Sequence, residues 1–151
     1  MKKLVLTILA LMLVACSADN KIIGKWQKVS NGDNYTNVET CTFSSNNTET
    51  CDEDFTINTN GRSINIKYVI TQEWHIKDGV ISEKYLDART QAITLNGENL
   101  LPTDPQYQSI AQILLSDKPN GKTFSRKIVF KENVFELYEE DGKKSEFVKM
   151  N

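Results

Sequence analysis

The feature that most constrains the fold of this chain is a regular alternation of apolar and polar residues from Arg62 to Lys77. The other parity of this stretch is polar except for Val69. Side chains on a β-strand point to opposite faces with a period of two, so the stretch predicts one long strand with a buried face and a solvated face. The apolar parity carries Ile64, Ile66, Tyr68, Ile70, Trp74 and Ile76.

The length of this strand predicts a curved sheet. Asn60-Gly61 precedes it and Asp78-Gly79 follows it, and both dipeptides tolerate the positive φ angles of tight hairpin turns. A straight strand of this length would reach about 50 Å at about 3.3 Å per residue, which is too long for a domain of this size. We therefore expect the strand to curve or to carry a bulge near Gln72, the polar residue on the apolar parity.

The turns along the rest of the chain predict antiparallel strands. Six of the seven glycines follow Asn or Asp, a regularity typical of strands joined by tight turns. We expect a first apolar segment over Lys21–Ser30 and a three-stranded meander over Thr123–Met150. Between them, strands are expected at Tyr35–Phe43, Cys51–Ile57, Val80–Leu86 and Thr90–Leu95.

One segment has helical rather than strand spacing. Asp104 suits an N-cap and Pro105 suits the first helical position. The apolar residues that follow at helical spacing are Tyr107, Ile110, Ala111 and Leu114. They predict a helix near residues 104–116 whose apolar stripe packs on the sheet or plugs one end of it. The fold class is therefore mainly β: an antiparallel barrel or strongly curved sheet of about eight to ten strands with one short helix.

The start of the chain resembles the signal segment of a bacterial lipoprotein. Met1-Lys2-Lys3 is basic, Leu4–Val14 is apolar but too short to span a bilayer, and Leu13-Val14-Ala15-Cys16 resembles the lipobox. The resemblance implies cleavage before Cys16, diacylation of its thiol and acylation of the new amino terminus, with palmitate-type chains as the membrane anchor. The alternative is an ordinary secretory signal that contains a chance cysteine.

This resemblance also implies the domain organisation and the location. Residues 1–15 are the expected signal peptide, residues 16–20 the lipidated cysteine and a short linker, and residues 21–151 a single β-rich domain. The expected location is the bacterial cell envelope, and Ser17 in place of Asp favours the outer membrane. Removing the signal leaves 16 basic and 20 acidic residues, a net charge of −4, which argues against a nucleic-acid partner.

The two remaining cysteines, Cys41 and Cys51, form an even pair in an oxidising compartment and predict a disulfide. In the chain-entropy model, closing this loop stabilises the fold by about 3 kcal/mol. A metal site is the rival interpretation, but no histidine or further cysteine lies near the pair, and two thiolates are poor zinc ligands on their own. No metal and no cofactor are expected.

Pairing Cys41 with Cys51 also sets the register of the two strands that carry them. Tyr35 then lies opposite Ile57, and Glu39 lies opposite Glu53. Because like charges in direct opposition are unfavourable, we expect this pair either at a solvated edge or relieved by a bulge. The run Asp52-Glu53-Asp54 could attract a cation, but it is more typical of a solvated charge run at the start of a strand.

The sequence lacks the residue patterns of common catalytic sites. His75 is the single histidine and lies on the polar parity of the long strand, where we expect it in solvent. No Gly-x-Ser-x-Gly elbow surrounds any serine, and each glycine belongs to a turn or stands alone rather than in a phosphate-binding loop. We therefore expect a protein that is not an enzyme.

Gly24-Lys25-Trp26 resembles the Gly-x-Trp signature on the first strand of lipocalins. The resemblance implies a calycin-like barrel in which Trp26 closes one end beneath an arginine from a late strand. Arg126 is the candidate, since it shares the parity of Phe124 and Ile128, and an arginine over Trp26 would form a cation–π contact. The chain departs from that family because its helix precedes three further strands. A buried aromatic residue in an amphipathic first strand is an equally good interpretation of Trp26.

Two functions are expected from these observations. The first is a non-catalytic binding module that holds a small apolar ligand in a lipocalin-like barrel. The second is a solid barrel that binds an envelope protein, as an inhibitor, an exclusion or immunity factor, or an assembly accessory, through loops such as Ser44–Thr48 or Leu101–Asp104. For the first function, the expected ligand-binding residues are Trp26, Ile66, Tyr68, Ile70, Trp74 and Arg126, and also Ile128.

Overall fold

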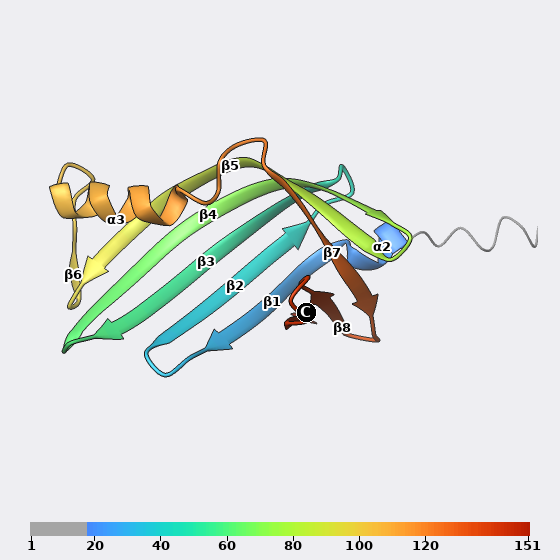
Figure 1. Cartoon of the computed structure of the whole chain (residues 1–151), viewed down its shortest axis with the longest axis horizontal. Helices are drawn as coiled ribbons and strands as arrows, with labels where there is room; N and C mark the ends of the chain where they lie inside the picture. The colour runs from blue at the N-terminus through green and yellow to red at the C-terminus, as the bar shows by residue number, and fades with distance from the viewer. Residues whose placement is uncertain (1–17) are drawn as a thin grey trace, which may run out of the picture.

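The protein folds as an antiparallel β-barrel of eight strands, as a computed structural model of residues 18–151 shows (Figure 1). The predicted class, mainly β with a short helix beside the sheet, is confirmed. The barrel strands are β1 Gly24–Asn31, β2 Tyr35–Phe43, β3 Thr48–Thr59, β4 Arg62–Lys77, β5 Val80–Leu95, β7 Thr123–Phe130, β8 Val134–Tyr138 and β9 Lys144–Lys149. The remaining elements are α2 Ala18–Ile22, α3 Pro105–Leu115 and the two-residue strand β6 Glu98–Asn99 on the edge of β5.

The barrel is an up-and-down meander that closes at one end. Each barrel strand pairs with the next one along the chain, and β9 pairs back onto β1. The closing ladders are short, because β9 is paired with Trp26 and Gln27 of β1, and β7 is paired with Val80–Lys84 of β5. Beyond these contacts β1–β5 continue as an open, curved sheet, with α2 and α3 at opposite ends of the molecule (Figure 1). We call these two parts the closed end and the open end.

The long strand predicted from the sequence is β4, with the predicted bounds. Asn60, Gly61, Asp78 and Gly79 all have positive φ angles in the turns that flank it. The register of β4 against β5 shifts between Lys67 and Tyr68 and again between Thr71 and Gln72, so the bulge expected near Gln72 is confirmed.

The prediction of two separate strands over Val80–Leu86 and Thr90–Leu95 was wrong, because β5 is continuous from Val80 to Leu95. The two register shifts leave Leu86 and Gln91 of β5 without a partner residue on β4. Each extra residue shifts the alternation of side chains by one position, which breaks the periodic pattern while the backbone pairing continues.

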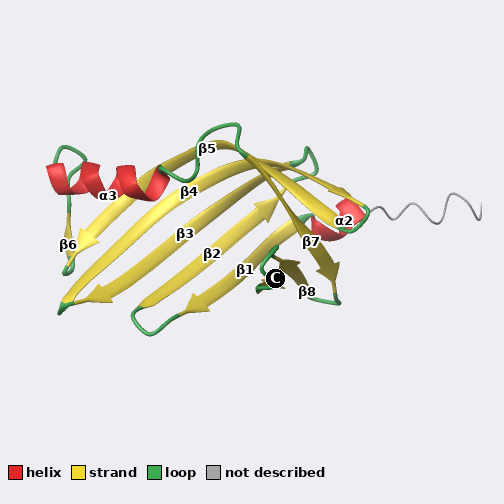
Figure 2. Ribbon diagram, in the orientation of Figure 1, coloured by secondary structure: helices red, strands yellow, loops and turns green. Residues whose placement is uncertain are grey.

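The apolar interior consists of two clusters. One fills the closed end beneath α2 and contains the disulfide together with Ile22, Trp26, Phe43, Trp74, Ile81, Ile128, Phe135, Leu137 and Phe147. The other lies at the open end on β4 and β5, where Ile66, Tyr68, Ile70 and Ile93 face the sheet side of α3. The helix α3 runs along the open end of the sheet (Figure 2). Its apolar residues pack against the second cluster, which confirms the predicted packing of the helix on the sheet.

The described part of the chain begins with one short helical segment. Residues 18–22 form the short helix α2, and Ile22 is fully buried in the closed-end cluster. A helix of this length has no periodic stripe that a sequence pattern could reveal. Cys16 and the lipobox lie outside the described residues. Within residues 18–151, no helix has the length and apolar character needed to cross a membrane.

Candidate functional site

The interior of the barrel contains the predicted disulfide. Cys41 on β2 and Cys51 on β3 lie directly opposite each other with a sulfur–sulfur distance of 2.07 Å. The predicted register is confirmed, with Tyr35 opposite Ile57 and Glu39 opposite Glu53. A carboxylate oxygen of Glu39 lies near the two sulfurs. Because the sulfurs are bonded to each other, they cannot act as the thiolate ligands that zinc requires.

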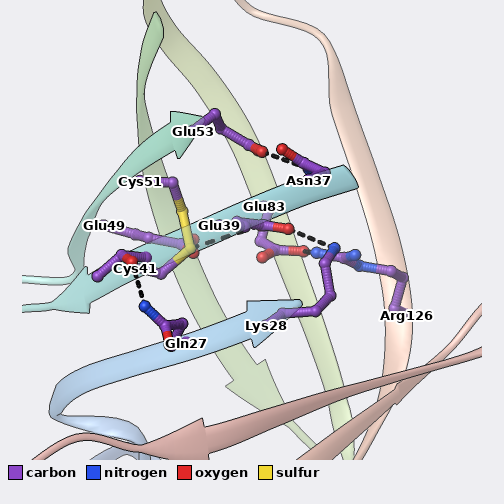
Figure 3. The surroundings of a disulfide bond; sticks show 11 residues. Gln27, Lys28, Asn37, Glu39, Cys41, Glu49, Cys51, Glu53, Glu83 and Arg126 are labelled. Carbon is purple, nitrogen blue, oxygen red and sulfur yellow. Dashed lines mark hydrogen bonds and ion pairs between the residues drawn. A yellow bond between two sulfur atoms is a disulfide. The ribbon is translucent and has the colours of Figure 1, made fainter. Parts of the chain in front are cut away.

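Charged side chains gather beside the disulfide on the inward faces of five strands (Figure 3). We call this group the charged layer. Three of its residues lie in one row across the sheet. The successive cross-strand partners in this row are Lys28 on β1, Glu39 on β2, Glu53 on β3 and the uncharged Tyr68 on β4. The charged residues of the layer are Lys28, Glu39, Glu49, Glu53, Glu83 and Arg126.

The like-charge pair of Glu39 and Glu53 is neither solvated nor relieved by a bulge. Glu53 is only 8% exposed, and the β2–β3 register is unbroken at this point. Lys28 forms an ion pair with Glu39, and Asn37 Nδ2 donates a hydrogen bond of 2.7 Å to Glu53 Oε2. Burial, and secondarily the neighbouring Glu39 carboxylate, raise the pKa of Glu53 to about 7. The expectation of a solvated run at residues 52–54 was therefore wrong for Glu53, which points into the barrel.

Arg126 points inward, as its parity predicted, but its partner is a carboxylate rather than Trp26. Arg126 Nη2 and Nε donate to Glu83 Oε2 at 2.6 and 3.2 Å. The cation over the Trp26 ring is Lys149, whose Nζ lies 5.4 Å from the ring centroid. The expected Arg126–Trp26 contact was wrong because Glu83, on the neighbouring strand β5, offers Arg126 an opposite charge inside the barrel.

Glu49 is a buried carboxyl of the charged layer and lies beside the disulfide. Its Oε1 lies 3.0 Å from Cys51 Sγ, and its buried Oε2 has no hydrogen-bond donor among the described residues. Burial, followed by the nearby Glu83 carboxylate, raises the pKa of Glu49 well above its ordinary value.

The layer as a whole carries more acid than base. Four carboxyl groups face two cations, Lys28 and Arg126, and these cations pair with Glu39 and Glu83. Glu49 and Glu53 therefore must hold protons or meet a cation from outside the layer. The sequence did contain a signal for this layer, because Glu49 and Glu53 share the strand parity of Cys51 and Phe55.

The structure distributes the predicted ligand-binding residues over three places. Trp26 and Trp74 are packed in the closed end, where Trp26 Nε1 donates to the Ile22 carbonyl oxygen at 2.6 Å. Ile128 belongs to the same cluster. Arg126 lies in the charged layer. The open-end cluster beneath α3 holds Ile66, Tyr68 and Ile70.

The predicted position of His75 is confirmed, because its side chain is 65% exposed on the outer face, beside Glu73. Strand parity places His75 on the opposite face of the sheet from the charged layer.

A hollow of about 540 Å³ lies at the open end, between α3 and the ends of β3, β4 and β5. Its volume falls in the range of small-molecule sites. Sequence reasoning did not identify it, because it depends on where α3 is placed over the sheet. We call it the open-end hollow. It is lined by Thr59, Asn60, Arg62, Ile64, Leu95, Gln106, Ser109 and Ile110.

No protein-family model matches this chain, and no curated protein sequence matches it. The function must therefore be inferred from the fold and from the arrangement of its interior.

Proposed function

We propose that this protein is a lipid-anchored envelope protein that acts as a non-catalytic binding module and holds a small, largely apolar ligand at its open end. The observation that carries the proposal is the open-end hollow. Ile64, Leu95 and Ile110 form its apolar walls. The helix that roofs it has no fully buried residue, so α3 covers the sheet without closing it off. Eight-stranded up-and-down barrels are the architecture in which lipocalins hold one small ligand.

The arrangement of the interior supports the open end as the ligand site. The closed end is filled by interlocking aromatic rings, such as Trp26 against Phe135 and Phe43 against Trp74. A ligand would have to displace this packed core to enter there, at a cost of several kcal/mol. The concave face of β1–β5 beyond the charged layer needs no such rearrangement.

The position of α2 supports an orientation for the anchored protein. α2 lies at the closed end (Figure 1), and it begins two residues after Cys16 in the sequence. Acyl chains on Cys16 would therefore attach the barrel to the membrane by its closed end. The open-end hollow would then face away from the bilayer, where a ligand can reach it from the aqueous phase.

Binding of an apolar fluorescent probe tests the proposal. The non-lipidated chain from Ser17 to Asn151 contains every strand and both clusters, and N-phenyl-1-naphthylamine is a suitable probe. Ile110→Trp should fill the hollow and weaken probe binding by at least about tenfold. The matched control is Ile113→Trp on the same helix, because Ile113 is 72% exposed and lines no part of the hollow. Equal binding by the two variants would contradict the proposal.

Native mass spectrometry of the same chain, purified from the periplasm with its disulfide intact, provides a second test. A small mass that co-purifies with the wild-type protein, and is absent from Ile110→Trp, is the expected result. This measurement detects a bound ligand by its mass, whatever its chemical identity.

One observation favours the alternative function of binding an envelope protein. Leu101, on the segment before α3, is 63% exposed, and Ile113, on α3, is 72% exposed. Exposed apolar residues that form one contiguous patch are typical of a partner surface. In that case Leu101→Asp combined with Ile113→Asp would abolish partner capture and leave probe binding at the hollow unchanged.

A further inference from the structure

The interior of the barrel contains acceptor oxygens that lack donors. Among the described residues, the buried oxygens without a hydrogen-bond partner are Asn37 Oδ1, Glu49 Oε2 and Thr90 Oγ1. Leaving a buried polar atom unpaired costs about 1–3 kcal/mol. Asn37 Oδ1 belongs to the amide group that donates to Glu53, so it lies beside that carboxyl.

Glu53 accepts its hydrogen bond from a neutral group rather than from a cation. The Asn37 amide donates to Glu53 Oε2 at 2.7 Å, and Tyr68 is the cross-strand partner of Glu53 on β4. A buried carboxylate normally requires a positive partner, because neutral hydrogen bonds only partly replace its hydration.

The nearby cations are engaged elsewhere. Lys28 is paired with Glu39. Lys118, in the segment after α3, donates to the Leu114 carbonyl oxygen at 3.2 Å and to Asp117 at 2.8 Å. Its ammonium group lies 5.7 Å from the centroid of the Tyr68 ring, so it approaches the layer without reaching Glu53 through a direct ion pair.

An apolar strip connects Glu53 with the open-end hollow. On β3, the inward residues from Glu53 toward the open end are Phe55 and Ile57, and both are only half-buried. Ile57 lies opposite Ile64, which lines the hollow. Ile57 lies four positions after Glu53 on β3, so the two residues are about 13 Å apart along the strand. This length suits an alkyl chain of moderate size.

We infer that the ligand of the open end is an amphiphile with a protonated amine head. Its ammonium group donates to Glu53 and to Asn37 Oδ1, and its chain lies over Phe55 and Ile57 toward the hollow. An ammonium group has three donors and no acceptor, which matches the unpaired acceptor and the uncompensated carboxyl at this position. The inference deepens the proposed function and rests on it.

The ionisation of Glu53 makes this binding dependent on pH. The groups that face Glu53 are Lys28 on β1, Glu39 on β2, Tyr68 on β4 and Lys118 after α3. Because the pKa of Glu53 is about 7, its carboxylate form predominates at pH 8 and its neutral form at pH 5.5. An alkylamine remains protonated at both values. Its affinity should therefore rise with pH, whereas that of an uncharged alcohol should not.

Two probes of equal chain length test the inference. Dodecylamine and dodecanol, below the concentrations at which they aggregate, compete with N-phenyl-1-naphthylamine for the chain from Ser17 to Asn151 at pH 8. The amine should bind at least about tenfold more tightly than the alcohol. Glu53→Gln should abolish that preference, so that the variant binds the amine and the alcohol with equal affinity. The matched control is Asp52→Asn, because Asp52 is the exposed neighbour on the outer face of the same strand.

Each outcome of this experiment decides between the two proposals. Equal affinities of the wild-type protein for amine and alcohol, or a preference for amine that survives in Glu53→Gln, would overturn the inference and leave the proposed function standing. If none of the three compounds binds, the proposed function itself fails. The pH series on the wild-type protein is an independent test that needs no variant, and an amine affinity that is the same at pH 5.5 and pH 8 would also overturn the inference.

Discussion

Glu53 illustrates how a single residue can link the stability of this barrel to its proposed function. The barrel keeps a carboxyl group in its interior, opposite a second carboxyl on the next strand, and gives it only neutral hydrogen-bond donors. Removing a carboxylate from water without a counter-charge is unfavourable, so Glu53 retains its proton to a higher pH than an exposed glutamate. In the absence of a ligand, the barrel bears the cost of ionising Glu53.

The first prediction is that Glu53→Gln changes how stability depends on pH. The pKa of Glu53 rises from 4.5 to about 7 on folding, so the folded state holds this proton more tightly than the unfolded state. Its contribution to stability is therefore fully present below about pH 4.5 and is lost as the pH rises through 7. At about 1.4 kcal/mol per pKa unit, the loss is on the order of 3 kcal/mol.

Urea unfolding at pH 4.5 and pH 8 measures this effect. Relative to the wild-type protein, Glu53→Gln should gain stability at pH 8 compared with pH 4.5. Asp52→Asn is the control and should follow the wild-type pH profile, because Asp52 is exposed on the outer face. Parallel profiles for wild type and Glu53→Gln would contradict the assigned role of this carboxyl group.

At the residue scale, strand parity predicted more than composition did. Parity placed Arg126 inside the barrel, and the pairing of Cys41 with Cys51 set Glu39 opposite Glu53. Both predictions are confirmed. The partner of Arg126 could not be predicted, because Glu83 lies 43 positions away in the sequence and meets it only through the pairing of β5 with β7. Glu53 was misjudged because its two acidic neighbours suggested a solvated run.

Among the elements, the β2–β3 hairpin is the one most constrained by covalent chemistry. Its disulfide closes a loop between positions separated by 10 residues. It also fixes the register that places Asn37, Glu39 and Glu53 in the interior. A slip of one residue in this hairpin would turn all of these side chains to the outer face.

The second prediction is that reduction of the disulfide lowers the free energy of unfolding by about 3 kcal/mol, mainly because the unfolded chain regains the entropy of the open loop. Both cysteines are buried, so the reductant should act only on unfolded molecules and change the equilibrium midpoint in urea. The double variant Cys41→Ala with Cys51→Ala is the control, and its midpoint should not respond to reductant. A wild-type midpoint that is also unaffected would show that the disulfide does not form.

Element boundaries could be predicted where turn chemistry and periodicity agreed. The bounds of β4 were predicted correctly, because an Asn-Gly and an Asp-Gly turn enclose an alternation that only Val69 and Gln72 interrupt. β5 was divided in error, since its two bulges interrupt the alternation without interrupting the hydrogen bonding. The placement of α3 over β4 and β5, which creates the open-end hollow, depends on tertiary packing that no local pattern encodes.

At the scale of the whole molecule, the barrel combines a solid half with an open half. The closed end is stabilised by stacked and edge-on aromatic rings, by the disulfide and by α2. The open end has a single helix resting on a curved sheet. Closure of only one end was not predictable from the sequence, because the β1–β9 contact that completes the barrel involves two residue pairs from opposite ends of the domain.

The third prediction is that the two halves differ in local stability. α3 contacts the sheet through one stripe, and none of its residues is fully buried. β8 is shorter than α3, but it has three successive buried residues, Phe135, Glu136 and Leu137. Local opening requires less free energy where fewer apolar contacts are lost. The amides of α3 should therefore exchange with deuterium through local opening, and those of β8 only through global unfolding.

Hydrogen–deuterium exchange with mass spectrometry distinguishes these cases, because urea accelerates global unfolding far more than local opening. Exchange of β8 should accelerate steeply with urea below the midpoint, whereas exchange of α3 should begin fast and respond weakly. A ligand in the open-end hollow should slow exchange in α3 and leave the local opening of distant surface turns unchanged. If α3 is as protected as β8 in the absence of ligand, the helix belongs to the rigid core, and the hollow beneath it cannot admit a ligand by the movement of α3.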